Sequence, residues 1–229
     1  IVITSYNLGW YVEDISLSQD GRYAVISDGG DSQYIGLIDL QSRAVVQTIN
    51  ISPRYAQCID IGPDGKVLVG DFNNAMVYQY KLDYQTGNIT DTGLSIGFTS
   101  SPFNIAISPD GSNAIIALSG QSAVIKLHEN NELSLIQNLP ALAAQSAVYS
   151  SDGLKAFVNK INSNPNQVYA YSINTDGTMQ FLRSYTLGTT NAGGFFGLNT
   201  LATNVDGSIV YASHPSTPAH ANMYVINTV

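Results

Sequence analysis

The sequence predicts an all-β protein, a five-bladed β-propeller of four-stranded blades. Two observations carry this prediction. An Asp-Gly pair recurs between short apolar runs, and successive pairs lie 44, 46, 42 and 54 residues apart. A period of about 40 to 50 residues with several short strands in each period is typical of a propeller. The aspartates of the five pairs are Asp20, Asp64, Asp110, Asp152 and Asp206.

The third pair shows why this pattern predicts a hairpin. In Ser108-Pro109-Asp110-Gly111, Pro fixes φ near about −65°, Asp bonds its own backbone and Gly accepts a positive φ. The flanking runs 103–107 and 114–118 are apolar, and two such runs joined by this turn form antiparallel strands.

Each period is expected to hold four strands, divided by turn residues. We predict strands at 12–18, 23–27, 34–40 and 45–51, then at 56–62, 66–70, 76–82 and 89–96. The third and fourth periods give 103–108, 114–118, 123–128 and 133–138, then 145–150, 155–159, 167–173 and 179–187. The fifth gives only 199–205, 208–213 and 223–227.

The missing strand of the fifth period suggests how the ring closes. Residues 1–4 form an apolar run near the place where a fourth strand would precede the first turn. We therefore expect this N-terminal strand to complete the last blade, because closure removes an exposed sheet edge. The prediction is one domain, residues 1–229, with blades at about 5–51, 52–98, 99–139, 140–188 and 189–229 plus strand 1–4. The alternative is five consecutive periods of a larger ring.

Composition excludes several classes of protein. Hydrophobic residues make up 44% and charged residues 11%, which suits a folded core and not a disordered chain. The net charge of −8 and nine scattered basic residues argue against binding of nucleic acid or of an anionic membrane. No apolar run reaches the ~18 residues of a membrane span, so no membrane insertion is expected. The low charge and the Ser, Asn, Thr and Gly content favour an extracellular or cell-surface location.

Candidate site residues follow from the topology. In a propeller, the connections into each first strand and out of each second strand share one face, which we call the loop face. The Asp-Gly turns share the opposite turn face. Seven residues before each turn aspartate, the first strands start at Glu13, Gln57, Phe103, Gln145 and Asn199. The polar members predict either a ring that holds a ligand, water or metal, or a solvated channel mouth.

Oxygen-bearing residues also follow several of the second strands on the loop face. Asp28-Gly29-Gly30-Asp31 and Asp71-Phe72-Asn73-Asn74 carry donors that suit a hard divalent cation such as calcium. The candidate metal ligands are Glu13, Asp28, Asp31, Asp71 and Asn159. No other cofactor is predicted.

Two insertions break the period on the same face. Residues 188–197 lengthen one connection and residues 214–221 another, and Trp10 and Tyr11 lie one blade away. Aromatic and imidazole groups on such loops suit recognition of a protein, peptide or glycan, or else they plug the ring. The candidate ligand-binding residues here are Trp10, Tyr11, Phe195, Phe196, His214 and His220, together with Gln57, Gln145 and Asn199 of the ring.

The runs Ile105-Ala106-Ile107-Ser108-Pro109-Asp110-Gly111 and Ile35-Gly36-Leu37-Ile38-Asp39-Leu40 resemble the YVTN-type and lactonase-like propeller repeats. The resemblance covers nearly the whole chain and implies the propeller fold. It also implies a metal-dependent lactonase- or lyase-like enzyme as one function, although those families have about seven blades and five is a departure.

No catalytic residues are predicted, because no Ser/His/Asp order, Gly-x-Ser-x-Gly elbow or phosphate loop is found. The first hypothesis is a non-enzymatic recognition or scaffold domain that binds through the loop face. The lactonase- or lyase-like enzyme, with Glu13, Asp28, Asp71 and Asn159 around an ion in the channel, is the second hypothesis. A lectin is the third, disfavoured because the loop residues differ between blades.

Overall fold

The fold is all-β, as the sequence predicts. The computed structural model describes residues 5–6, 8–30, 33–130, 132–139, 143–160, 167–187, 200–217 and 220–229, and the side chains of 214–217 and 220–222 lie outside this description. The described residues form 19 strands in five antiparallel sheets and no helix. A helix with the length and hydrophobicity of a membrane span is therefore not found in this part of the chain.

The sheets follow one another along the chain, and each adds its strands in sequence order. Sheet 1 contains β1 (Asp14–Leu17), β2 (Tyr23–Ser27), β3 (Tyr34–Asp39) and β4 (Ala44–Asn50). Sheet 2 contains β5 (Ala56–Ile61), β6 (Lys66–Asp71), β7 (Met76–Asp83) and β8 (Asn88–Gly97). Sheet 3 contains β9 (Pro102–Ile107), β10 (Asn113–Leu118), β11 (Ala123–Leu127) and β12 (Leu133–Asn138).

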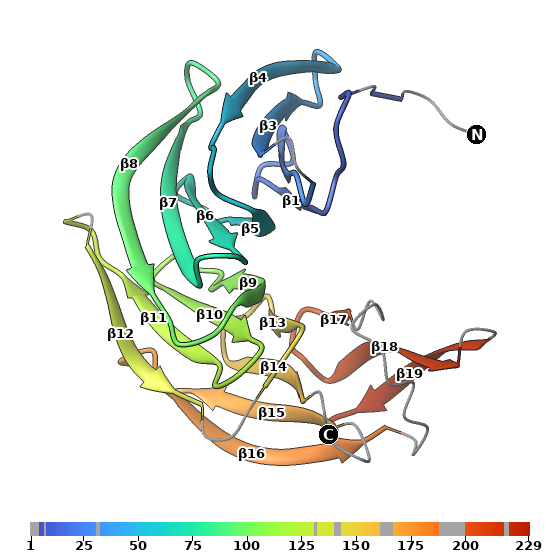
Figure 1. Ribbon diagram of the computed structural model, residues 1–229. Helices are drawn as coiled ribbons and strands as arrows, with labels where there is room; N and C mark the ends of the chain where they lie inside the picture. Colours follow the sequence, from blue (N-terminus) through green and yellow to red (C-terminus); the bar gives the residue numbers. More distant parts are fainter. Residues whose placement is uncertain are drawn as a thin grey trace.

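Sheet 4 contains β13 (Ala147–Tyr149), β14 (Lys155–Lys160), β15 (Gln167–Ile173) and β16 (Met179–Thr186). Sheet 5 has three strands, β17 (Leu201–Thr203), β18 (Ile209–Thr217) and β19 (His220–Asn227). Figure 1 shows the sheets side by side around an arc, with the first strand of each along the inner side. We call the space that these inner strands border the channel.

The Asp-Gly turns are confirmed. The glycine after each of the five aspartates has a positive φ, which is +72° at Gly111. Asp110 accepts the backbone N–H of Ser112 at 3.0 Å and the Ser108 hydroxyl at 2.6 Å, and Ser108 in turn accepts the N–H of Asn113 at 3.0 Å. The Ser108 and Asp110 side chains therefore hold the turn together and bond it to Asn113, the first residue of the next strand. This is why so short a sequence predicts the hairpin.

Apolar side chains pack between adjacent sheets. Side chains alternate between the two faces of a strand, so a central strand buries residues on both sides. In β2, Val25 packs in the core shared with sheet 2, whereas Ile26 packs on the opposite face. In β14, Val158 packs against sheet 3 and Phe157 against sheet 5. The cores of the molecule are thus layers between sheets.

A repeated hydrogen bond joins the inner strand of each sheet to that of the next. In every case a side-chain oxygen of the earlier strand, or of the residue just before it, accepts a backbone N–H of the later strand, which satisfies a donor facing the channel. We call these the inner hydrogen bonds. They run from Ile59 to Asp14 Oδ2 at 3.0 Å, from Ile107 to Asp60 Oδ2 at 2.7 Å, from Ala147 to Asn104 Oδ1 at 3.0 Å and from Leu201 to Ser146 Oγ at 3.1 Å.

Glutamine side chains make a second set of inter-sheet contacts on the outer strands. Gln47 of β4 donates to the carbonyl of Ile89 at 3.0 Å and accepts its N–H at 2.7 Å. Gln137 of β12 does the same with Met179, at 2.9 and 2.6 Å. Each amide acts as an extra strand residue, so two of the sheet pairs are joined at both their inner and outer margins.

Within the described residues, the sheets do not close into a ring (Figure 1). The fifth sheet shows three strands, and the expected closing strand, residues 1–4, lies outside the described residues. Closure by that strand is therefore not confirmed, and a ring of five blades stays a prediction. At the first end of the arc, Tyr6, Leu8 and Trp10 pack on the free face of sheet 1. At the last end, Tyr211, Met223 and Val225 of sheet 5 are 40%, 70% and 61% exposed.

The prediction that residues 214–221 form a loop was wrong in part. Its backbone continues the hairpin of β18 and β19, and His214 pairs with Asn222 while Pro215 pairs with Ala221. The proline is tolerated because a strand can place it where no ladder N–H is required.

Candidate functional site

The start of the inner strands was predicted to form a polar ring, and the structure brings two of its members into contact. Gln57 Nε2 donates to Glu13 Oε1 at 2.7 Å, from sheet 2 to sheet 1. Phe103, the next member of the predicted ring, is the second residue of β9 in sheet 3. Gln145 uses its backbone N–H to bond Asn159 Oδ1 at 2.9 Å. Asn199 lies outside the described residues.

The polar residues expected after the second strands lie at the ends of β6 and β14, where they hold the backbone of their own sheet. Asp71 Oδ1 accepts the N–H of Tyr55 at 3.1 Å, and its Oδ2 accepts the Asn74 amide at 2.7 Å. Asn159 Oδ1 accepts the N–H groups of both Gln145 and Ser146, at 2.9 and 2.7 Å. These two candidate metal ligands therefore fix the segment that leads into the inner strand. The recurrence of a polar residue at the end of the second strand in several repeats was the sequence signal for this structural role.

Asp28, the corresponding residue of sheet 1, differs from Asp71 and Asn159 in its hydrogen bonds. It is fully buried, its Oδ1 accepts the N–H of Gly30 at 2.7 Å, and its Oδ2 has no hydrogen-bond partner among the residues that the structure describes. Asp31 lies outside the described residues. Three or more His, Cys, Asp or Glu side chains placed to share a metal ion are not found in the described part of the chain. Calcium binding at these positions stays a prediction.

The predicted aromatic residues separate into different environments. Trp10 packs on the free face of sheet 1, and its ring lies 6.3 Å from that of Tyr34, so it covers apolar surface. Tyr11 is 80% exposed. Phe195 and Phe196 lie outside the described residues, as do the side chains of His214 and His220 in the β18–β19 hairpin.

The sequence analysis missed a set of aromatic rings on the loop face. Phe72 lies between Tyr55 and Phe103, with ring centroids 6.1 and 5.6 Å away. All three are half-buried. We call them the aromatic row. Register explains the assembly, because Ala56 pairs with Asp71 and thereby sets Tyr55 beside Phe72. The sequence shows three isolated aromatic residues, each at the loop end of a strand, and only the sheet packing brings them together.

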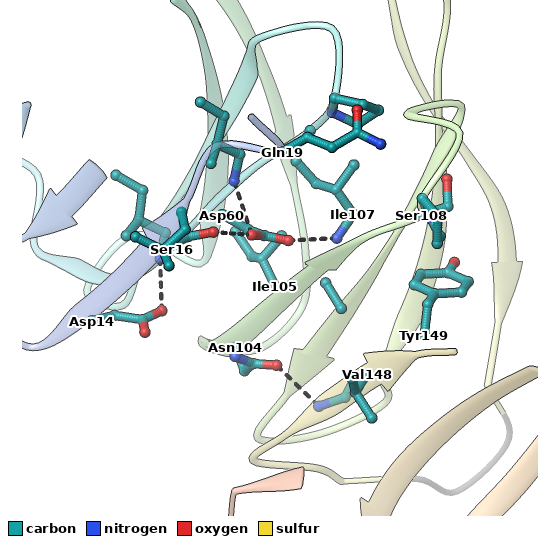
Figure 2. A pocket seen from close by; sticks show the side chains of 18 of the residues that line it. Asp14, Ser16, Gln19, Asp60, Asn104, Ile105, Ile107, Ser108, Val148 and Tyr149 are labelled. Atoms are coloured by element: carbon teal, nitrogen blue, oxygen red, sulfur yellow. Dashed lines mark hydrogen bonds between the residues drawn. The ribbon is translucent and has the colours of Figure 1, made fainter. Parts of the chain in front are cut away.

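A cavity of about 520 Å³ lies along the channel. The inner strands β1, β5, β9 and β13 line it, together with turn residues such as Pro63 and Pro109. It therefore reaches the turn face, opposite to the face on which the sequence placed a site. Figure 2 shows Asp14, Ser16 and Asp60 on the side of the first two inner strands, and Tyr149 on the side of β13.

Two carboxyl groups lie in the cavity wall. Asp60 Oδ1 accepts the Ser16 hydroxyl at 2.5 Å and the N–H of Ile61 at 2.9 Å, and its Oδ2 accepts the N–H of Ile107 at 2.7 Å. Burial outweighs these bonds and raises the pKa of Asp60 to about 6. Burial also raises the pKa of Asp14, against its bonds from Ile59 and Ile15. Both groups thus hold protons more tightly than an exposed aspartate does.

Tyr149 is another polar residue that lines the cavity. It is 7% exposed, and its hydroxyl has no hydrogen-bond partner within the described ranges of the chain. Burial raises the pKa of this hydroxyl, which therefore keeps its proton at neutral pH. A buried hydroxyl without a partner costs free energy, so such a group in a cavity wall needs an explanation.

Comparison with known proteins shows the fold. No family model matches the chain, and no curated protein matches it. A protein of unknown function from Desulfotomaculum acetoxidans is similar, with a TM-score of 0.80 and 22% identity over 95% of this chain and 68% of that one. Hydrazine synthase of Kuenenia stuttgartiensis has a TM-score of 0.75 and 18% identity over 98% of this chain and 67% of its own.

A candidate 6-phosphogluconolactonase from Bacteroides uniformis has a TM-score of 0.69 and 15% identity, over 93% of this chain and 66% of that one. The chain thus spans about two thirds of each of these proteins. Their likeness confirms a propeller-like fold that a lactonase-like protein shares.

Proposed function

We propose that this domain is a non-enzymatic recognition or scaffold module, secreted or displayed at a cell surface, that binds a protein, peptide or glycan through its loop face. The aromatic row is the observation that carries the proposal. Its three rings stand half-buried at the loop ends of sheets 2 and 3, and the exposed Tyr11 lies on the same face, next to Gly30.

Half-buried aromatic rings suit recognition for a physical reason. They offer a large apolar area, and their neighbours have already fixed the side chains, so binding costs little conformational entropy. Glu13 and Gln57 add hydrogen-bonding groups at the channel mouth. The net charge of −8 favours a neutral or basic ligand over an acidic one.

The test is a screen of the chain against a glycan array and a peptide library, followed by titration of any ligand found. The double variant Phe72→Ala, Phe103→Ala removes two rings of the row. We expect it to weaken binding at least about tenfold, because a buried aromatic anchor contributes on the order of 2 kcal/mol or more to an interface. A second variant, Phe195→Ala with Phe196→Ala, tests the two aromatic residues that the sequence predicts in the loop 188–197.

Phe181→Ala is the matched control, because Phe181 is an exposed aromatic residue on β16 and 53% of it is accessible. It should leave the affinity unchanged. The proposal is wrong if no ligand binds in either screen, or if the aromatic-row variant binds as well as the wild-type domain while both remain folded by circular dichroism.

A lactonase- or lyase-like enzyme is the second candidate, and the fold shared with a candidate 6-phosphogluconolactonase favours it. Such an enzyme would hold a divalent ion between Glu13, Asp28, Asp71 and Asn159. The Oδ2 of buried Asp28, which has no hydrogen-bond partner among the described residues, supports this arrangement. Asp71 and Asn159 argue against it, because a side-chain oxygen of each already accepts a backbone N–H.

Thermal melts with EDTA, calcium, magnesium or manganese separate the two candidates. An ion at 100 times its dissociation constant stabilises the folded state by about 2.7 kcal/mol, which a melt detects. A rise with one ion, lost in Asp28→Asn and accompanied by lactone hydrolysis, would replace the recognition proposal with the enzyme. The recognition proposal predicts melting temperatures that are the same in every condition.

A further inference from the structure

We propose that the ligand of the loop face is a neutral oligosaccharide, bound by the aromatic row together with a polar pair beside it. This inference rests on the proposed recognition function and narrows the ligand from a protein, peptide or glycan to one class. The pair is Glu13 and Gln57, and the row is Tyr55, Phe72 and Phe103. We call these five residues the mouth surface.

One backbone carbonyl joins the polar and the aromatic parts of the mouth surface. The carbonyl of Tyr55 accepts the N–H groups of both Gln57 and Phe72, each at 3.0 Å. The Gln57 amide bonds Glu13 in sheet 1 at 2.7 Å. The Phe72 ring contacts Phe103 in sheet 3, with centroids 5.6 Å apart. The five residues thus form a continuous series across three sheets, so one extended ligand can contact both parts.

Two members of this series are the extra residues of β-bulges. The chain neighbours of Gln57 in β5 pair with consecutive residues of β6, so Gln57 lies opposite no residue of that strand. Phe103 is extra in β9 in the same way, against β10. Both lie seven residues before the turn aspartate of their sheet. Bulges recur next to binding sites because the extra residue re-aims its side chain. The repeat thus presents an amide and an aromatic ring at corresponding points.

The position of Glu13 is fixed as well. Its N–H donates to the carbonyl of Ser27 at 2.9 Å, and its Oε1 accepts the Gln57 amide. A Cβ at Gly29 would overlap the Glu13 carboxylate, so only glycine leaves room for this side chain. The carboxylate is therefore oriented before a ligand arrives, which reduces the entropy lost on binding.

The polar groups of the mouth surface suit a ligand that donates hydrogen bonds. Glu13 Oε2 and Gln57 Oε1 are acceptors that make no hydrogen bond to a residue that the structure describes. A saccharide offers hydroxyl donors to these oxygens, and its C–H groups give the aromatic rings an apolar face to contact. A proline-rich peptide fits less well, because it offers carbonyl acceptors and its prolines have no N–H.

The charge of the ligand follows from Glu13. The ion pairs of the described chain involve Arg22, Arg54 and Lys66, so none of them neutralises this carboxylate, which would repel an anion. A cation would gain little, because Glu13 is exposed and an exposed ion pair contributes little free energy. A neutral sugar bonds the carboxylate through hydroxyl groups and needs no countercharge.

Neutral tetrasaccharides of glucose, mannose, galactose and N-acetylglucosamine are the probes. Each is titrated into the full chain by calorimetry, beside two charged counterparts, tetragalacturonate and the tetramer of glucosamine. We expect at least one neutral probe to bind with the same affinity in dilute and in concentrated salt, because salt screens only charged contacts. The proposal is overturned if no neutral probe binds at millimolar concentration, or if a charged counterpart binds more tightly than every neutral probe.

Three variants locate the site of a neutral probe that binds. Phe103→Ala removes the aromatic ring of one bulge and should weaken binding about tenfold or more. Glu13→Ala removes the carboxylate and should weaken binding about tenfold. Gly29→Ala keeps the five residues but displaces the carboxylate, so its effect should approach that of Glu13→Ala. Glu129→Ala is the control, because it removes the same charge from an exposed position between β11 and β12, and it should leave the affinity unchanged.

The saccharide inference and the recognition proposal can fail separately. A library peptide that binds, and loses affinity in Phe103→Ala, while no saccharide binds would refute the saccharide and leave the recognition proposal standing. If neither a peptide nor a saccharide binds, both are wrong. Circular dichroism establishes that each variant is folded, and Glu13→Ala decides the matter if Gly29→Ala does not fold. Saccharide binding that is unchanged in the folded variants would refute the mouth surface as its site.

Discussion

Asp60 of β5 accepts the backbone N–H of Ile107 in β9 at 2.7 Å, across the boundary between sheets 2 and 3. The two residues are 47 positions apart, about one repeat period. Asp14 makes the same kind of bond to Ile59 one sheet earlier, and Asn104 makes it to Ala147 one sheet later. A propeller sheet has no backbone ladder to its neighbour, so these side chains supply the directional contacts that apolar packing lacks.

Loss of one inner hydrogen bond should destabilise the fold measurably. Asn104→Ala leaves the N–H of Ala147 without its acceptor, and an unsatisfied buried donor costs about 1 to 3 kcal/mol of unfolding free energy. The measurement is urea denaturation. Asn138→Ala, at an exposed position of β12 in the same sheet, is the control and should change stability by less than about 0.5 kcal/mol. Equal effects of the two substitutions would show that the inner bond contributes nothing.

Stability should fall as the pH rises from about 4 to about 6. Burial raises the pKa of Asp60 from its ordinary value of 3.8 to about 6 in the folded protein, so the folded state binds this proton more tightly than the unfolded chain does. Asp14, the titratable group beside it, is shifted in the same direction. Between the two pKa values ionisation therefore favours unfolding.

Urea midpoints at pH 4, 5, 6 and 7 measure this dependence, and Asp60→Asn should flatten it. Asp206→Asn should keep the wild-type slope above pH 4. Hydrogen bonds from Ser208 lower the pKa of Asp206, so its contribution is complete above the ordinary range of an aspartate and is lost only as the pH falls further. A wild-type slope in Asp60→Asn would contradict the assignment.

Two glutamines should respond to the same substitution with opposite signs. Gln79 of β7 is 1% exposed, and neither polar atom of its amide has a hydrogen-bond partner among the described residues. Gln79→Met removes this unsatisfied group at similar volume and should stabilise the protein by about 1 kcal/mol or more. Gln47→Met loses both bonds to Ile89 and should destabilise it by about 1 to 3 kcal/mol. Chemical denaturation of both variants gives the comparison, and a loss of stability in Gln79→Met would mean that its amide is satisfied.

The turn glycines allow backbone strain to be separated from crowding. Gly21 and Gly111 have φ of +68° and +72°, but a Cβ at Gly21 meets nothing within 4 Å whereas one at Gly111 lies 3.2 Å from Pro63. Gly111→Val should cost about 1 to 3 kcal/mol, and Gly21→Ala about 1 kcal/mol from the backbone alone. Thermal melts of the two variants test this. A nearly neutral Gly111→Val would mean that the turn conformation is wrong.

The strands and turns could be predicted from the sequence because their signals are local. Each Asp-Gly turn is held by bonds within about five residues, such as those of Ser108 with Asp110 and Asn113. Alternating apolar residues then fix which side chains of β2 or β14 are buried. The period along the chain gave the number of sheets but not whether they close, because closure depends on the angle between packed sheets.

The site could be predicted only in part, because its residues meet through packing between repeats. The sequence placed Gln57 and Glu13 at equivalent positions, and they do form a hydrogen bond. It did not identify the aromatic row, since Tyr55 and Phe72 lie in two separate connections and Phe103 lies in β9. The cavity was missed as well, because Asp14, Asp60 and Tyr149 occupy different positions of their repeats and have no common spacing.

The two ends of the arc give the molecule a direction. Phe157 in sheet 4 is buried by sheet 5, whereas Tyr211, at the same place after its own Asp-Gly turn, remains 40% exposed. The free face of sheet 1 is instead covered by Tyr6, Leu8 and Trp10. Among the described residues, the first end of the arc is thus covered by its own chain, whereas the last end leaves apolar side chains exposed. A repeat grafted beyond β19 would meet these exposed side chains, while one grafted before β1 would first have to displace Tyr6, Leu8 and Trp10.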